Sequence, residues 1–381
     1  MIALYIHLPW CVRKCPYCDF NSYALKGVLP EDDYLKALLA DLDMSLPQIP
    51  GRTISSVFMG GGTPSLFSAG EIGNLLTGIR ARLPLADDIE ITLEANPGAL
   101  DSGAEKLAAF RAAGVNRLSL GIQSFNDERL AALGRIHGRA AALEAAGEAV
   151  RHFGRVNLDL MYGLPGETLA EAVEDVETAL EFSPTHLSCY ALTLEAHTRF
   201  AANPPPLPDA DCCADMNDAI AARLAAAGFA HYETSAFARP GYSCQHNLNY
   251  WRFGDYLGLG AGAHSKISRF SETGEWQVVR ETRPRHPGAY LRAVAAGNPA
   301  RSTRVIPAKE LPLEFLMNAL RLEEGFTSTL YERRTGLSFA ALLPRLQNAV
   351  RAGLLDAQMD CVAPTPLGRN FLNRLLRDFL D

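Results

Sequence analysis

Short apolar and β-branched runs alternate with longer amphipathic stretches in the first half of the chain. The amphipathic stretches, such as EDDYLKALLADLDMSL, AEKLAAFRAAG and LAEAVEDVETALEF, carry apolar residues at helical spacing. Strands that alternate with helices predict a parallel sheet with right-handed crossovers. The runs that we interpret as strands are ALYIHL (3–8), SSVFM (55–59), IEITLEA (89–95), RLSLGI (117–122), VNLDLMY (156–162) and HLSCYAL (186–192).

Six βα units of this kind, closed or nearly closed, predict an α/β fold of the incomplete (β/α)6 TIM-like barrel type. A doubly wound open sheet is the alternative with the same pattern. Polar and glycine-rich motifs follow the strands, namely GGGTPS after the second, EANPG after the third, GIQSF after the fourth and YGLPGET after the fifth. Because the loops at the carboxyl ends of barrel strands form active sites, we expect these motifs to share one site.

The pattern changes in the second half of the chain. NPPPLPDADCC (203–213) interrupts it and a helix is predicted over 209–227, whereas 229–290 is rich in aromatic residues and glycine without a clear helical period. Helical stretches return after RVIPAKELP, and the strand-like piece AQMDCVAPTPLG precedes a last helix. We therefore expect a barrel over 1–235, an extension over 236–300 and a helical, winged-helix-like domain over 301–381.

Composition and charge narrow the function classes. The 381 residues are 48% hydrophobic and 21% charged, as in an ordinary globular protein. The net charge of −7 argues against a nucleic-acid-binding surface on the protein. Residues 301–381 hold 11 Lys and Arg and nine Asp and Glu, and this small positive excess favours an interaction or lid module over a DNA-binding domain. Neither a membrane span nor a signal peptide is recognisable, so a cytoplasmic protein is expected.

Three of the eight cysteines, Cys11, Cys15 and Cys18, follow the first strand with the spacing C-x3-C-x2-C. A structural zinc site takes four ligands, and no second CxxC or histidine pair lies nearby. A [4Fe–4S] cluster held by three cysteines leaves one iron open to an outside ligand, which suits a catalytic or cofactor-binding cluster. The remaining cysteines are scattered and are expected to be structural: Cys189, Cys212, Cys213, Cys244 and Cys361.

CVRKCPYC after a first strand, followed by GGGTPS, resembles the signature of the radical S-adenosylmethionine (SAM) superfamily. In that superfamily SAM chelates the open iron, and one electron from the cluster cleaves SAM to a deoxyadenosyl radical. The strand-end residues are similar to the SAM-binding set of the coproporphyrinogen III oxidase-like family. This resemblance implies that SAM is bound by Tyr5, Tyr17, Gly61, Gly62, Thr63, Glu94, Gln123, Arg135, Asp159 and Ala191.

Two features indicate a branch of that family. HNLNYW (246–251) matches an HNxxYW motif and resembles the haem chaperones of the HemW branch, which makes His246 the candidate haem ligand. Phe20 stands where the oxygen-independent coproporphyrinogen III dehydrogenase has a fourth cysteine, and Cys11 comes much earlier in the chain than in that enzyme. His264, in GLGAGAHSK, is assigned to the SAM set, with haem or a backbone carbonyl as its other candidate partners.

We therefore expect a protein of radical SAM fold that binds a [4Fe–4S] cluster, SAM and haem. It would pass haem to client proteins, including respiratory enzymes at the membrane surface, and would take electrons from a donor protein. Two alternatives stay open: decarboxylation of coproporphyrinogen III to protoporphyrinogen IX, against which the departures at Cys11 and Phe20 count, and another radical SAM reaction such as methyl transfer. No nucleic-acid partner is expected.

Overall fold

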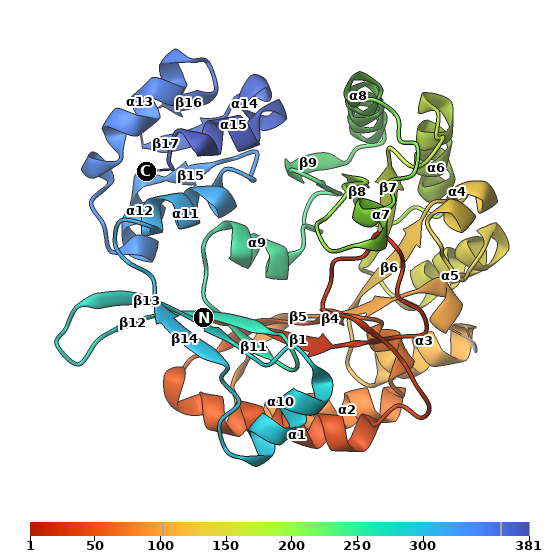
Figure 1. Ribbon diagram of the computed structural model, residues 1–381, viewed down its shortest axis with the longest axis horizontal. Helices are drawn as coiled ribbons and strands as arrows, with labels where there is room; N and C mark the ends of the chain where they lie inside the picture. Colours follow the sequence, from red (N-terminus) through yellow and green to blue (C-terminus); the bar gives the residue numbers. More distant parts are fainter. Residues whose placement is uncertain (101–102, 359, 381) are drawn as a thin grey trace.

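A twelve-stranded sheet forms the centre of the molecule, and the six strands expected from the sequence are its parallel middle (Figure 1). The computed structural model describes the whole chain except residues 101, 102, 359 and 381. Each predicted strand is present within a few residues, in the spatial order of the sequence: β1 (Ile2–Leu8), β4 (Ile54–Gly61), β5 (Leu85–Ala95), β6 (Arg117–Gln123), β7 (Val156–Tyr162) and β8 (His186–Ala191).

The sheet is extended at both edges by strands from the second half of the chain. Next to β1, β11 (Tyr256–Leu259) pairs in parallel, followed by antiparallel β12 (His264–Phe270), β13 (Trp276–Thr282) and β14 (Ser302–Val305). Next to β8, β10 (Ala236–Ala238) and β9 (Ala230–Glu233) pair in antiparallel fashion. The strand order runs from β14 to β9, and the sheet curves strongly between β1 and β8 (Figure 1), so the barrel is open, as expected.

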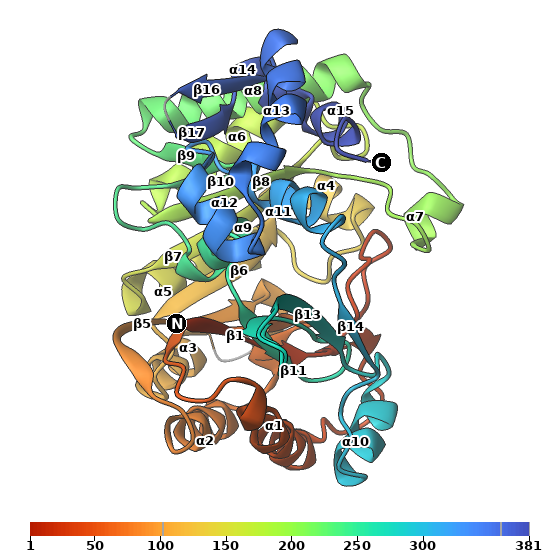
Figure 2. The same ribbon diagram turned by 90° about the vertical axis from the view of Figure 1, so that its left-hand side faces the viewer.

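Helices cover the outer, convex face of this curved sheet, where they bury the apolar side of β1 to β8 (Figures 1 and 2). The predicted amphipathic stretches are helical, and the helix expected over 209–227 is α8. The covering helices are α1 (Glu31–Ser45), α2 (Ala69–Arg80), α3 (Gly103–Ala112), α5 (Arg139–His152), α6 (Leu169–Glu181) and α8 (Ala210–Ala226). Shorter elements between them are β2 (Trp10–Cys11), β3 (Tyr23–Ala24), α4 (Asp127–Ala132) and α7 (Arg199–Ala202), while α10 (Pro287–Ala295) packs on α1.

The HNLNYW motif forms a helix, α9 (Gln245–Trp251), although its surroundings show no helical period in the sequence. It lies on the inner side of the sheet, against β4, between the barrel and the C-terminal domain (Figure 1). Seven residues make only two turns, which is too short for an apolar period to be recognised.

The C-terminal residues form a separate core next to α9, built on Phe315, Tyr331, Leu346 and Leu375. As predicted, helices precede a small β wing, and a last helical segment follows it. The elements are α11 (Leu311–Ala319), β15 (Phe326–Thr327), α12 (Ser328–Thr335), α13 (Leu343–Arg351), β16 (Leu355–Gln358), β17 (Cys361–Pro364), α14 (Pro366–Asn370) and α15 (Leu372–Arg377), with the strands in the order β15–β17–β16.

The expected domain boundaries at 235 and 300 stay predictions, but the expected extension over 236–300 shares its sheet with the barrel through β10 to β13. Across the described residues, none of the helices has both the length and the apolar character needed to cross a membrane.

Candidate functional site

The carboxyl ends of the parallel strands surround a cavity of about 700 Å³, here called the central cavity. It is lined by the cysteine loop, by the strand-end motifs and by residues of β8, so the structure brings together segments that are far apart in the sequence. The predicted site residues that line it are Cys11, Cys15, Cys18, Tyr17, Gly61, Gly62, Thr63, Glu94, Gln123, Arg135, Asp159 and Ala191.

The three cysteines of the loop are free thiols, each partly exposed to the central cavity. Burial raises the pKa of Cys11 and of Cys18, so a cationic centre is needed to keep these side chains as thiolates. Among the described residues, no group of three or more His, Cys, Asp or Glu is arranged to hold a single metal ion. The thiols fit an iron–sulfur cluster in that they line one cavity from one loop, and the cluster on Cys11, Cys15 and Cys18 stays a prediction.

The glycine motif passes directly under the cysteine loop. The amide of Gly62 donates to the carbonyl of Leu8 at 2.9 Å, and a Cβ at Gly62 would lie 2.5 Å from the carbonyl oxygen of Trp10. Gly61 has φ 117°, and a Cβ there would lie 2.4 Å from the ring of His7. Glycine is therefore required at both positions: a Cβ at Gly62 would displace the backbone just before Cys11, and at Gly61 the positive φ and the nearby ring of His7 exclude a side chain.

Two partly buried carboxyl groups face the central cavity. Glu94 accepts a hydrogen bond from the amide of Gly61 at 3.1 Å, and burial together with the nearby Asp159 raises its pKa to about 7. Asp159 accepts hydrogen bonds from Ser119 Oγ at 3.1 Å and Asn157 Nδ2 at 2.8 Å, and burial raises its pKa. Such groups are suited to bind an ammonium group or ribose hydroxyls, which SAM carries.

Arg135 is one of the cationic side chains that line the central cavity. Its Nη2 donates to Asn96 Oδ1 at 2.6 Å and to the carbonyl of Gly121 at 2.9 Å, while its Nη1 lies 3.7 Å from Cys15 Sγ. The Nε is buried and has no hydrogen-bond partner among the described residues. A guanidinium that is held at the cavity wall by these acceptors fits a ligand carboxylate. Sequence reasoning missed Asn96 and Gly121, because their contacts arise only in the fold.

Gln123 ends β6 in the left-handed region with φ 71°, and its Oε1 accepts a hydrogen bond from the hydroxyl of Tyr190 at 2.9 Å. This backbone turn directs the chain away from the sheet at the cavity wall. Tyr190 is a third lining residue that was not expected from the sequence, although it directly precedes Ala191 on β8.

Tyr5 and His264 do not line the central cavity. They lie in a neighbouring cavity of about 400 Å³, here called the side cavity, which shares Phe20, Gly61 and Glu94 with the central one. The SAM-binding set that the resemblance implies is therefore divided between two adjoining cavities. The assignment of each residue to SAM stays a prediction.

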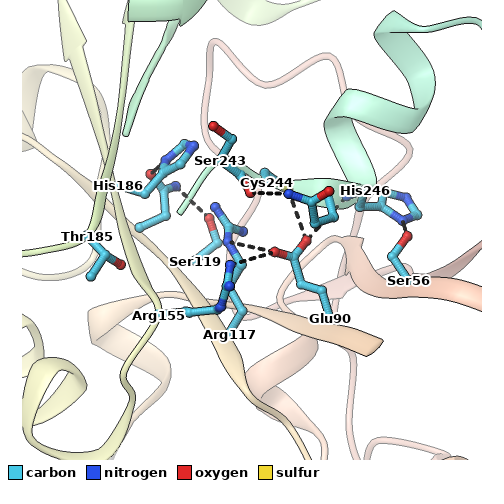
Figure 3. Close-up of polar contacts among 12 residues, drawn as sticks. Ser56, Glu90, Arg117, Ser119, Arg155, Thr185, His186, Ser243, Cys244 and His246 are labelled. Atoms are coloured by element: carbon cyan, nitrogen blue, oxygen red, sulfur yellow. Dashed lines mark hydrogen bonds and ion pairs between the residues drawn. The ribbon is translucent and has the colours of Figure 1, made fainter. Parts of the chain in front are cut away.

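His246 lines neither cavity. It is 1% exposed, with Nδ1 3.0 Å from Ser56 Oγ and Nε2 3.2 Å from the hydroxyl of Tyr250 (Figure 3 shows the pair with Ser56). Burial, and then the charge of Arg117, lower its pKa to about 3. Since both ring nitrogens have partners, iron can bind His246 only after one of these hydrogen bonds breaks. The predicted haem ligand is thus one layer behind the side cavity, which Tyr250 lines.

A charged network around the buried Glu90 holds the start of α9 in place, and it was not expected from the sequence. Glu90 Oε2 lies 3.8 Å from both Arg117 Nε and Arg155 Nη1 (Figure 3). The other oxygen of Glu90 faces the amide of His246 at 3.3 Å and the thiol of Cys244 at 3.6 Å. This network joins β5 and β6 to the HNLNYW helix.

The C-terminal domain also reaches the central cavity. Arg321, just after α11, lines it together with Glu233, and its Nη2 donates to Glu233 Oε2 at 3.2 Å. None of the five scattered cysteines is among the residues that line the central or side cavity, and all five are free thiols.

Comparisons with known proteins agree with this architecture. A protein-family model described as the radical SAM superfamily matches residues 5–179, and one described as the HemN C-terminal domain matches 306–371. Over its whole length the chain is 48% identical to the protein named heme chaperone HemW of Escherichia coli (strain K12), covering 98% of that relative. Identity to the heme chaperone HemW of Mycobacterium tuberculosis (strain H37Rv) is 38%, covering 99% of this chain and 94% of the relative.

Among solved structures, the radical SAM enzyme coproporphyrinogen III oxidase (HemN) from Escherichia coli superimposes with a TM-score of 0.82 at 24% identity, covering 99% of this chain and 89% of that one. This likeness confirms the fold. Radical SAM proteins use a [4Fe–4S] cluster and SAM, which suits the thiols, carboxyl groups and guanidinium of the central cavity. From the full-length similarity we conclude that the chain belongs to the HemW family within the radical SAM superfamily.

Proposed function

We propose that this protein binds haem and delivers it to haem-dependent client proteins, with a [4Fe–4S] cluster and SAM bound beside the haem. The observation that carries the proposal is 48% identity over the entire chain to a relative named heme chaperone. The clients proposed are respiratory enzymes, met in the cytoplasm at the membrane surface, and a donor protein would supply electrons to the cluster.

The central cavity supports the cofactor part of the proposal. Cys11, Cys15 and Cys18 would hold three irons, and the fourth would be left for SAM. Arg135 would bind the carboxylate of SAM and Glu94 its ammonium group, in keeping with their charges. When bound, the cluster supplies the electron with which radical SAM chemistry begins.

Phe20 supports a haem chaperone rather than a coproporphyrinogen III dehydrogenase. It takes the place of the fourth cysteine of the dehydrogenase and is 62% exposed, at the border between the central and side cavities. An exposed aromatic side chain at this point offers an apolar surface to a flat ligand. The full-length relatives at 38–48% identity carry the chaperone name, whereas the decarboxylating enzyme matches at 24% and shows the fold alone.

His246, which the motif resemblance makes the candidate haem ligand, could bind iron only on one condition. Its hydrogen bond to Ser56 or to Tyr250 has to break before iron can bind, so haem ligation by His246 requires a local rearrangement of these side chains.

The test uses the full chain with its cluster reconstituted under anaerobic conditions. Haem titration, coproporphyrinogen turnover and haem transfer to membranes with haem-depleted respiratory enzymes are measured on one preparation. We expect the chain to bind haem and to transfer it, and we expect no conversion of coproporphyrinogen to vinyl-bearing products. Cys15→Ala should lose the cluster absorbance, and Cys212→Ala, far along the chain on α8, serves as the matched control. Vinyl products without haem transfer would instead establish the decarboxylase.

A further inference from the structure

We infer that haem binds in the side cavity with His264 as its iron ligand, its ring against Phe20 and its propionates on Arg285 and Arg301. This inference deepens the proposed function and rests on it. It assigns the iron to a histidine other than the one in the HNLNYW motif.

The histidines around the side cavity differ in whether their ring nitrogens are available. His7 lines the cavity, but its Nδ1 is 2.9 Å from the hydroxyl of Tyr5 and its Nε2 is 2.8 Å from the carbonyl of Asn21. His246, behind the wall, has both nitrogens bonded as well. His264 is exposed to the side cavity, and neither of its nitrogens has a hydrogen-bond partner among the described residues.

The protonation state of His264 also suits a metal ligand. Partial burial, and then the charges of Arg280 and Arg285, lower its pKa. The imidazole is therefore neutral at physiological pH, which is the form that binds iron.

Aromatic side chains line the side cavity and suit a flat, apolar macrocycle. Tyr5, Tyr250 and Tyr256 form its inner part, and Phe20 stands at its rim on the cysteine loop. Rings of this kind bury large apolar areas and stack on other π systems. The large exposed fraction of Phe20 means that this surface is available to a ligand.

Cations lie on the far side of Phe20. A third cavity of about 570 Å³, here called the outer cavity, shares Phe20 and Asn21 with the side cavity and is also lined by Lys14, Arg285 and Arg301. Neither Arg285 nor Arg301 has a carboxylate partner among the described residues. Two guanidinium groups without carboxylate partners, of which Arg285 donates only to the side-chain oxygen of Asn21, match the two carboxylates of a haem whose ring occupies the adjoining cavity.

The residues that the side cavity shares with the central cavity determine where the haem would lie relative to SAM. Gly61 and Glu94 separate the two cavities, so a haem on His264 would lie directly next to the candidate SAM site. The cysteine loop, through Phe20, contacts all three cavities and would join the cluster to the haem.

The experiment uses three porphyrins on the cluster-containing full chain: haem, iron-free protoporphyrin IX and the dimethyl ester of haem. His264→Ala should abolish the absorption spectrum of histidine-ligated haem and weaken haem binding at least about tenfold, without affecting protoporphyrin IX. Arg285→Glu with Arg301→Glu should weaken haem and protoporphyrin IX about tenfold or more, and leave the ester unchanged. His152→Ala on the outer face of the barrel is the matched histidine control. Cluster absorbance and thermal melting establish that each variant is folded.

Each result decides between the two proposals. If the wild-type chain binds no haem, the proposed function and this inference both fail. If the wild type binds haem and His264→Ala keeps its spectrum and affinity, the inference alone is overturned, and His246→Ala or His286→Ala then identifies the ligand. Equal losses for the ester and for haem in the arginine variant would overturn the propionate assignment.

Discussion

The guanidinium of Arg321 lies over the indole ring of Trp251, with its central carbon 4.3 Å from the ring centroid. Arg321 belongs to the C-terminal domain and Trp251 ends the HNLNYW helix, and the same guanidinium donates to Glu233 on β9. Backbone bonds from Thr234 to the carbonyl of Arg321 and from Glu323 to the carbonyl of Tyr232 continue this junction. One side chain thus connects barrel, motif and C-terminal domain at the wall of the central cavity.

Arg321→Ala should therefore loosen the C-terminal domain. The buried carboxyl of Glu233 would lose its charged partner and Trp251 its cation, which together should cost about 2 kcal/mol of unfolding free energy. Denaturant unfolding and limited proteolysis of the 301–381 segment measure the effect. The matched control is Arg223→Ala, whose pair with Glu177 is on the exposed outer surface and should matter little. Equal stability of the two variants would mean that Arg321 does not fix the domain.

The fold could be predicted because its strands are short runs rich in apolar and β-branched residues that alternate with amphipathic helical stretches. SSVFM and RLSLGI are examples. The strands that contain them, β4 and β6, extend beyond the expected bounds by at most two residues at either end. The HNLNYW helix could not be predicted, since its seven residues are fixed by long-range contacts such as that of His246 with Ser56.

Those site residues that stand at or directly after the carboxyl end of a strand could be predicted from the sequence. GGGTPS and Glu94 come together because neighbouring parallel strands end at one edge. The division into two cavities was not predictable, because it depends on how Gly61 and Glu94 pack against the cysteine loop. Arg321 was missed for a similar reason: its place beside the cavity follows from the docking of a distant domain.

Gly62→Ala should destabilise the cysteine loop, because the added Cβ would lie 2.5 Å from the carbonyl oxygen of Trp10. We expect a loss of about 1–3 kcal/mol and a lower cluster content after reconstitution. Gly70→Ala is the control: on α2 its Cβ would meet nothing within 4 Å, and it should stabilise the chain by about 0.5–1 kcal/mol. Cluster absorbance per chain and urea unfolding check both. Normal cluster content in Gly62→Ala would show that the loop can shift without harm.

Glu94→Gln should make the ligand-free chain more stable at high pH but not at low pH. The folded pKa of about 7 is above the ordinary value, so the folded state keeps a proton that the unfolded state loses between about pH 4.5 and 7. The ionised carboxylate therefore destabilises the fold above pH 7, by an amount on the order of 2 kcal/mol. Unfolding at pH 8 and pH 5 compares the two chains. The same variant should bind SAM more weakly at pH 8, and a stability gain at pH 5 equal to that at pH 8 would contradict the argument.

His246→Gln should reduce the loss of stability on acidification. The folded pKa of about 3 is below the ordinary value of 6.5, so below pH 6.5 the unfolded state binds a proton that the folded state refuses. Between pH 6.5 and 5 this should cost the wild type about 2 kcal/mol. Glutamine does not titrate and can hydrogen-bond to both Ser56 and Tyr250, so its stability should fall less over that interval. Urea unfolding at the two pH values measures the difference, with His152→Gln, at a partly exposed position at the end of α5, as the control. An unchanged slope would mean that the folded chain takes up a proton on His246 as readily as the unfolded chain does, and it would overturn this prediction.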